Sequence, residues 1–214
     1  MWAYDRRGRG QSSDADEYSF ELEVDDVRAI VAAAGAAAHV VGHSFGAYCA
    51  LEAAAVDSSF LTLVLYEPPL HGGRRATETR EGVRMLDAKD YEGGLLMFLS
   101  EVAGFSDDEV TLIRSIPEVW SRMLDAAPTV GREAVAVENR PWNPTRFASV
   151  RAPTLHVSGS LTDSPIYPSG ADIQAAIPHA VHTVLEGQRH IGFVTDPERF
   201  AEIVLDFTSR RGHS

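Results

Sequence analysis

The sequence predicts an α/β fold in which a mostly parallel sheet carries helices on both faces. Short apolar runs that are typical of strands alternate with helix-like segments along much of the 214-residue chain. A Gly-x-Ser-x-Gly motif at residues 42–46 stands between one such run and one such helix, where a strand passes into a helix. A stretch without strand patterns, from 71 to 150, predicts a helical insertion between the strands.

The periodicity of apolar residues and the residues typical of helix ends predict the strands and helices around the motif. Strands are expected at residues 1–4, 38–41 and 61–66, and helices at residues 19–35 and 47–55. The first helix has a capping residue, Ser19, at its start and Gly35 at its end, and its apolar residues share one stripe. The second helix is rich in alanine, the residue with the highest helix propensity.

In the second half of the chain, helical patterns come first and the remaining strand patterns follow. Helical patterns occur at residues 78–89, 90–103, 106–115 and 117–138, and strand patterns at 153–158 and 180–185. A last helix is expected after Asp196, because a capping residue followed by Pro197 is typical of a helix start. We therefore expect a core domain formed by residues 1–70 and 151–214 and a helical cap or lid formed by residues 71–150.

Ser44 is the candidate nucleophile because it occupies the centre of the Gly-x-Ser-x-Gly motif. A serine hydroxyl can attack a carbonyl when it projects from a tight turn, and such a turn leaves little room for side chains at Gly42 and Gly46. The turn also places the backbone N–H of Phe45 at the start of a helix, where it can donate to a developing oxyanion. An ordinary turn with a capping serine is the alternative interpretation.

A nucleophilic serine needs a base, and His190 is the candidate among the eight histidines. It follows the last predicted strand in a loop with glycines on both sides, so its ring could reach over Ser44. Two carboxylates could orient this base. Asp163 lies in the turn after one predicted strand, and Glu67 ends another. The residue pattern prefers Asp163 and leaves Glu67 open.

Four motifs in this order resemble those of the α/β-hydrolase family and together span most of the chain. They are Tyr4–Ser12, with the pattern Tyr-Asp-x-Arg-Gly-x-Gly-x-Ser, Gly42–Gly46, Pro153–Leu155 and Gly187–His190. The resemblance implies Ser44 as nucleophile, His190 as base and Asp163 as acid. It also implies the Phe45 amide as one oxyanion donor and a reaction that needs no metal ion and no organic cofactor.

The chain departs from the family pattern in two ways. Asp163 comes four residues after Gly159, whereas the family's aspartate comes three residues after the glycine of this turn, and this keeps Glu67 open as the acid. Members of the family also begin with strands that precede the segment at 1–4, and a loop after a His-Gly pair supplies their second oxyanion donor. Because the sequence lacks these features, we expect an N-terminally incomplete chain with an exposed sheet edge.

The composition favours a cytoplasmic enzyme that acts on a small molecule. A net charge of −12 argues against nucleic acid as a partner, and no apolar segment reaches the ~18 residues of a membrane span. The single cysteine, Cys49, excludes an internal disulfide and suits a reducing cytoplasm. The exposed sheet edge would allow the chain to form a homo-oligomer.

The predicted function is that of a serine hydrolase, which cleaves an ester, lactone or similar acyl bond of a small, fairly apolar substrate through an acyl-enzyme. The sequence does not separate an esterase from a perhydrolase or a carbon–carbon hydrolase with the same triad. The alternative is a catalytically impaired fragment or a ligand-binding relative without turnover, because the motif encodes only one of the two oxyanion donors.

Overall fold

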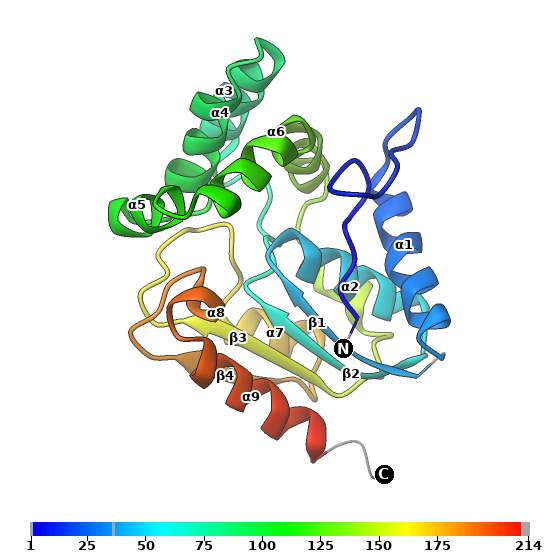
Figure 1. The fold of residues 1–214 in the computed structure, drawn as a ribbon. Coiled ribbons are helices and arrows are strands. Elements are labelled where there is room, and N and C mark those ends of the chain that lie inside the picture. The colour runs from blue at the N-terminus through cyan, green and yellow to red at the C-terminus, as the bar shows by residue number, and fades with distance from the viewer. Residues whose placement is uncertain (1, 36, 211–214) are drawn as a thin grey trace. The chain divides into compact units, whose positions relative to one another are not determined.

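Four apolar segments pair into one parallel sheet (Figure 1). The computed structural model describes residues 2–35 and 37–210. In chain order the strands are β1 (Ala38–His43), β2 (Phe60–Tyr66), β3 (Thr154–Gly159) and β4 (Val181–Leu185), and they lie side by side in that same order. All three pairings are parallel, so the strands end at the same edge of the sheet. His43 of β1 is registered opposite Tyr66 of β2, which places the residues that follow them next to each other.

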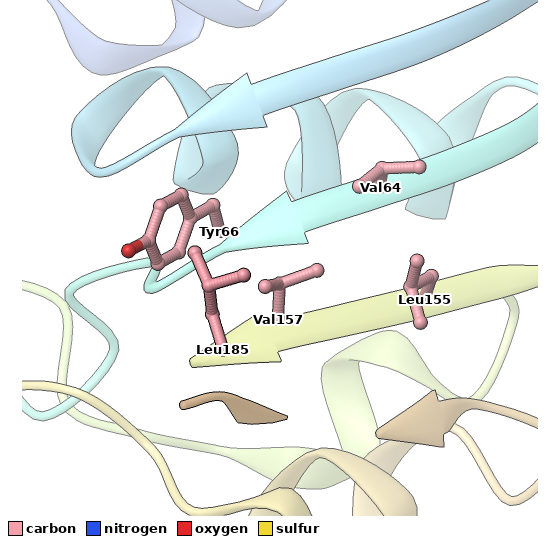
Figure 2. Close-up of a cluster of buried hydrophobic side chains, with 5 residues drawn as sticks. All are labelled: Val64, Tyr66, Leu155, Val157 and Leu185. Carbon is pink, nitrogen blue, oxygen red and sulfur yellow. The ribbon is translucent and has the colours of Figure 1, made fainter. Parts of the chain in front are cut away.

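Helices cover both faces of this sheet, as the alternation of elements predicts. Figure 2 shows the buried cluster on one face, formed by Val64, Tyr66, Leu155, Val157 and Leu185. Phe200 and Ile203 of the helix α9 (Pro197–Ser209) pack against this cluster. Because successive strand residues point to opposite faces, Leu63 and Leu65 lie on the other face, and the helix α2 (Phe45–Val56) packs against β1 and β2 there. Three short elements that the sequence did not predict complete this part: a 3-10 turn (Pro144–Phe147), α7 (Gly170–Ala176) and α8 (Gly192–Thr195).

The chain divides into a sheet unit and a helical unit. The sheet unit comprises residues 24–70, 142–163 and 167–210, and the helical unit comprises residues 2–23, 71–141 and 164–166. The helix α1 (Phe20–Ala33) begins in the helical unit and continues in the sheet unit. The predicted division assigns residues 2–23 to the core domain, whereas in the structure they group with the helices.

The helical segments expected between residues 71 and 150 are confirmed. They are α3 (Ala76–Asp87), α4 (Tyr91–Met97), which continues as a π-helical turn (Phe98–Val102), α5 (Asp107–Arg114) and α6 (Pro117–Glu138). The helix α5 begins at a capping box, in which the Ser106 hydroxyl and the Glu109 carboxylate each accept from the other residue's backbone N–H. Leu86, Phe98 and Ala127 form the buried centre of this unit.

A network of charged side chains joins the N-terminal segment to α6 within the helical unit. The Arg6 guanidinium donates to Glu23 at 3.1 Å and to Glu133 at 2.8 Å. Arg9 donates to the other oxygen of Glu133 at 2.6 Å, and burial lowers the pKa of Arg9. Because Glu23 and Glu133 are both buried, these arginines hold the segment onto the helix instead of facing solvent.

The strand expected at residues 1–4 is wrong for its described part, residues 2–4, and Met1 lies outside the described residues. Residues 2–4 group with the helical unit and pair with no strand of the sheet, and a strand forms only by pairing. In the described part of the chain, β1 and β4 are therefore the sheet edges, and association of two copies through an edge stays a prediction. Within residues 2–35 and 37–210, no helix combines the length and the apolar character that crossing a bilayer requires.

Candidate active site

Ser44 lies between β1 and α2, in the strand-to-helix turn that the motif predicts. Its N–H donates to the carbonyl of Tyr66 at 2.9 Å, and its own carbonyl accepts from the N–H of Ala47 at 2.9 Å. Its φ of 52° and ψ of −127° lie outside the regions that L-residues favour, which costs on the order of 1–3 kcal/mol. Phe45 is the first residue of α2, so its N–H lies at the helix N-terminus, where the oxyanion donor is expected.

The two glycines of the motif differ in the space around them. A Cβ on Gly42 would lie 2.5 Å from Cα of Ala47, so only glycine lets α2 approach the end of β1 this closely. A Cβ on Gly46 would meet no described atom within 4 Å apart from its chain neighbours and the nearby backbone of α2. The expectation that Gly46 keeps a crowded space open is therefore wrong within the described residues, because the direction of its missing side chain is open.

His190 lies in the loop between β4 and α8, and its side chain is buried beside Glu67. Nδ1 of His190 is 2.7 Å from Oε2 of Glu67, the distance of a strong hydrogen bond. Tyr167 stacks on the same ring, with ring centroids 4.5 Å apart. A carboxylate that accepts from Nδ1 selects the tautomer whose Nε2 carries a lone pair, as a general base requires.

Glu67 directly follows β2 and is fully buried. Its second oxygen, Oε1, accepts from the N–H of Gly159 at 2.7 Å, so both carboxylate oxygens have a donor. The φ of Glu67 is 46°, a left-handed conformation that is uncommon for residues other than glycine. Ser44 and Glu67 thus both carry backbone strain at the ends of two adjacent strands.

Asp163, the acid that the sequence prefers, does not pair with His190 in the described part of the chain. Its side chain is 75% exposed and lies 3.4 Å from the guanidinium of Arg189. Thr162, one residue earlier, is half-buried, and its hydroxyl oxygen is buried near Glu67. As the partner of the candidate base, Asp163 is therefore corrected to Glu67, because the turn directs Thr162 inward and Asp163 toward solvent.

Burial shifts both partners of the pair toward their neutral forms. It raises the pKa of Glu67, while the Thr162 hydroxyl and the Gly159 amide oppose this shift. It lowers the pKa of His190 to about 3. The carboxylate beside the ring stabilises the imidazolium, which would raise the pKa of His190. Burial has the larger effect and lowers this pKa, because the ring is almost completely removed from water. His190 is therefore neutral near neutral pH and can accept a proton.

Two further residues reach the site, His43 and Tyr66, and sequence reasoning missed both. The chain order excludes His43 as the base because it precedes Ser44, yet its ring lies 4.4 Å from the ring of His190. The hydroxyl of Tyr66 accepts a hydrogen bond from the N–H of Gly192, the first residue of α8 and two residues after His190. Both residues end parallel strands, and side chains at these ends line the sites of such sheets, which is the signal that could have found them.

The described residues offer side chains for proton transfer at this site and no metal centre. Among residues 2–35 and 37–210, no three histidine, cysteine, aspartate or glutamate side chains gather so that they could hold a metal ion. The groups at the site are instead a serine, two histidines, a tyrosine and a glutamate, which donate and accept hydrogen bonds and protons.

A strand that turns through a glycine-flanked serine into a helix, next to a buried carboxylate–histidine pair, defines a hydrolase of the α/β type. A profile of the alpha/beta hydrolase family matches residues 1–203. The chain belongs to this family. Comparison with curated proteins gave no match.

Solved structures with this fold cover nearly all of the chain. An α/β hydrolase from Sphaerobacter thermophilus is 30% identical, with 95% of this chain and 80% of that chain covered and a TM-score of 0.79. An enol-lactonase from Burkholderia xenovorans is 18% identical, with 96% and 79% covered and a TM-score of 0.77. A structure from a study of carboxylesterases of Nitrososphaera gargenis is 15% identical, with 96% and 78% covered and a TM-score of 0.76. At the two lower identities the likeness shows the fold alone.

Proposed function

We propose that the protein is a serine hydrolase that cleaves an ester, lactone or similar acyl bond of a small, fairly apolar substrate. The observation that carries the proposal is the 2.7 Å contact between Nδ1 of His190 and Oε2 of Glu67, beside the strand end that bears Ser44. A buried carboxyl–imidazole pair is an inefficient way to stabilise a fold, because burial penalises the charged form of either partner. The same pair is useful where an imidazole must hold one tautomer and move protons.

Each group has one role in the proposed reaction. Oγ of Ser44 attacks the carbonyl carbon of the substrate while Nε2 of His190 takes the hydroxyl proton, and Glu67 stabilises the imidazolium that forms. The N–H of Phe45 donates to the oxyanion of the tetrahedral intermediate. When this intermediate collapses, the leaving oxygen takes the proton from Nε2 and Ser44 stays acylated. Water then attacks the acyl group with His190 as base, which releases the acid and restores the serine.

The proposed substrate class follows from the chemistry of the groups and from the fold. A serine with a histidine base attacks carbonyl carbons that carry an oxygen leaving group, as esters and lactones do. The enol-lactonase from Burkholderia xenovorans has this fold, so the fold accommodates lactone cleavage. In a lactone the leaving oxygen stays tethered to the acyl group, so the same proton transfers serve both substrates.

Covalent labelling of Ser44 tests the proposal. A fluorophosphonate probe is expected to label the purified chain at Ser44, as read by mass spectrometry of the digested protein, and to leave Ser44→Ala unlabelled. Ser149→Ala is the matched control, because its hydroxyl donates to the carbonyl of Ala55 and carries no role in the proposed reaction. Hydrolysis of short p-nitrophenyl esters and lactones should fall by at least about 10³-fold in Ser44→Ala and His190→Ala. Equal labelling of the wild type and Ser44→Ala would overturn the mechanism.

The alternative is a relative that binds a small ligand without turnover. Such a protein would bind substrate-like esters and leave them intact, and Ser44→Ala would bind them as well as the wild type. Ester turnover by the wild type that is lost in both Ser44→Ala and His190→Ala would eliminate this alternative.

A further inference from the structure

We infer that His43 and Tyr66 are positioning residues, which hold the backbone of the loop that carries His190. The inference rests on the proposed function, in which His190 is the base. His43 directly precedes Ser44, and Tyr66 directly precedes Glu67. Each of two adjacent strand ends therefore presents one reacting group and one anchor for the third reacting group.

The hydroxyl of Tyr66 bridges two backbone groups on either side of His190. It donates to the carbonyl of Arg189 and accepts from the N–H of Gly192, which is 3.0 Å away. Tyr66 is fully buried and its ring stacks on Phe200, so the position of the hydroxyl is fixed. A Cβ on Gly192 would lie 2.6 Å from the Tyr66 oxygen, so the close approach of loop and hydroxyl requires glycine there.

The ring of His43 binds the peptide group between these two points. Nε2 of His43 is 2.8 Å from the carbonyl oxygen of His190, and because a carbonyl only accepts, Nε2 carries the proton. The ring packs against His190 and Phe193, with centroid distances of 4.4 and 4.6 Å. Burial, together with the neighbouring His190, lowers the pKa of His43 to about 3, so the ring stays neutral near neutral pH.

Together, His43 and Tyr66 fix the backbone position of His190, which the contact with Glu67 does not determine. That contact sets the rotation of the His190 ring through Nδ1, whereas the hydrogen bonds to the loop set the position of its backbone. A catalytic group displaced by 1 Å can lower a rate by about 10²-fold. Loss of an anchor should therefore reduce the rate of proton transfer and leave substrate binding nearly unchanged.

Two substitutions remove the anchors with little change in volume. Tyr66→Phe deletes only the bridging hydroxyl, and His43→Leu deletes the donor to the loop. His43→Gln is the rescue variant, because its side-chain NH₂ can replace the Nε2–H donor. His39→Leu is the matched control, since His39 lies on the same strand and its Nδ1 bonds the Thr62 hydroxyl at 2.9 Å, away from the loop.

We expect the kcat for a p-nitrophenyl ester to fall about 10- to 100-fold in Tyr66→Phe and His43→Leu, with KM within about twofold of the wild type. His43→Gln and His39→Leu should keep kcat within about threefold. The Nδ1–H of His190, which donates to Glu67, should give a low-field ¹H NMR signal, assigned by its loss in His190→Gln. This signal should shift or broaden in the two anchor variants and stay unchanged in the control.

Two results would overturn the positioning role. One is an equal kcat in His43→Leu and His43→Gln, because the donor would then make no difference. The other is an unchanged NMR signal in both Tyr66→Phe and His43→Leu. A shifted signal in the anchor variants, combined with no turnover and no Ser44 labelling in the wild type, would instead overturn the proposed function and support the positioning of His190.

Discussion

The ends of β2 and β3 each present a carboxylate, and the two lie in opposite environments. Glu67, after β2, is fully buried and has a donor on each oxygen. Asp163, in the turn after β3, is 75% exposed and makes a 3.4 Å contact with Arg189. The difference teaches that a place at a strand end does not by itself equip a carboxylate to orient a histidine. The carboxylate must also be buried away from solvent, because a hydrogen bond to an imidazole is strong only where the local dielectric is low.

The largest difference between the two strand ends should appear in catalysis. Glu67→Gln is expected to lower kcat/KM by about 10³- to 10⁴-fold, because a side-chain amide facing Nδ1 favours the wrong tautomer of His190. Asp163→Asn is the matched control and should stay within about twofold, since an exposed pair contributes little. Steady-state ester hydrolysis measures both. A greater loss in Asp163→Asn would place the acid at the other strand end.

The next difference should appear in stability. Glu67→Ala leaves buried donors on His190 and Gly159 without an acceptor and should lower the free energy of unfolding by about 2–4 kcal/mol. Asp163→Ala removes one exposed ion pair and should change it by less than about 0.5 kcal/mol, an effect that fades in about 1 M salt. Urea unfolding followed by circular dichroism measures both values. Similar losses in the two variants would contradict the contrast in burial.

Moving the acid from one strand end to the other is a smaller and more demanding test. The buried hydroxyl oxygen of Thr162 lies near Glu67, so adding Thr162→Asp to Glu67→Gln should recover at least about tenfold of the lost kcat/KM. The matched control adds Ser160→Asp, at an exposed position of the same turn. Equal recovery in both double variants would mean that the gain comes from the added charge and not from its place.

The last prediction concerns how the free energy of unfolding depends on pH. Burial lowers the pKa values of His43 and His190 from 6.5 to about 3. Between pH 3 and 6.5 the two rings therefore bind protons in the unfolded chain and stay unprotonated in the folded chain. The contribution of these two rings to the free energy of unfolding is therefore largest above pH 6.5 and falls as the pH drops toward 3. His190→Gln should reduce this slope by about 1.4 kcal/mol per pH unit. Arg189→Gln removes the exposed pair and no titrating histidine, so an equal change of slope in that variant would contradict the prediction.

The parts of the fold that the sequence predicts are those decided by residues near one another in the chain. The strand into Ser44 and the alanine-rich helix after it depend on local propensity and on one tight turn, and both are confirmed. The four helical segments of the helical unit follow from the same kind of pattern. The short helices α7 and α8 were missed because four to seven residues give too little periodicity to detect.

The site required information that no local pattern contains. The preference for Asp163 over Glu67 came from turn chemistry, whereas burial decides which carboxylate reaches His190. The contact of His43 with His190 joins residues 147 positions apart, so no window of sequence shows it. Residues 2–4 have strand-like composition, but a strand also needs a neighbour, and the sheet provides none for them.

The strained backbone of Ser44 means that selection for stability and selection for turnover would favour different residues at this position. Its φ of 52° and ψ of −127° are strained for serine, whereas glycine reaches positive φ values at little steric cost. Ser44→Gly would therefore relieve strain and remove the hydroxyl in one change. A population screened only for heat resistance would gain from that change, and a population screened for turnover would lose by it. Selection for durability alone would thus remove the nucleophile of the proposed reaction.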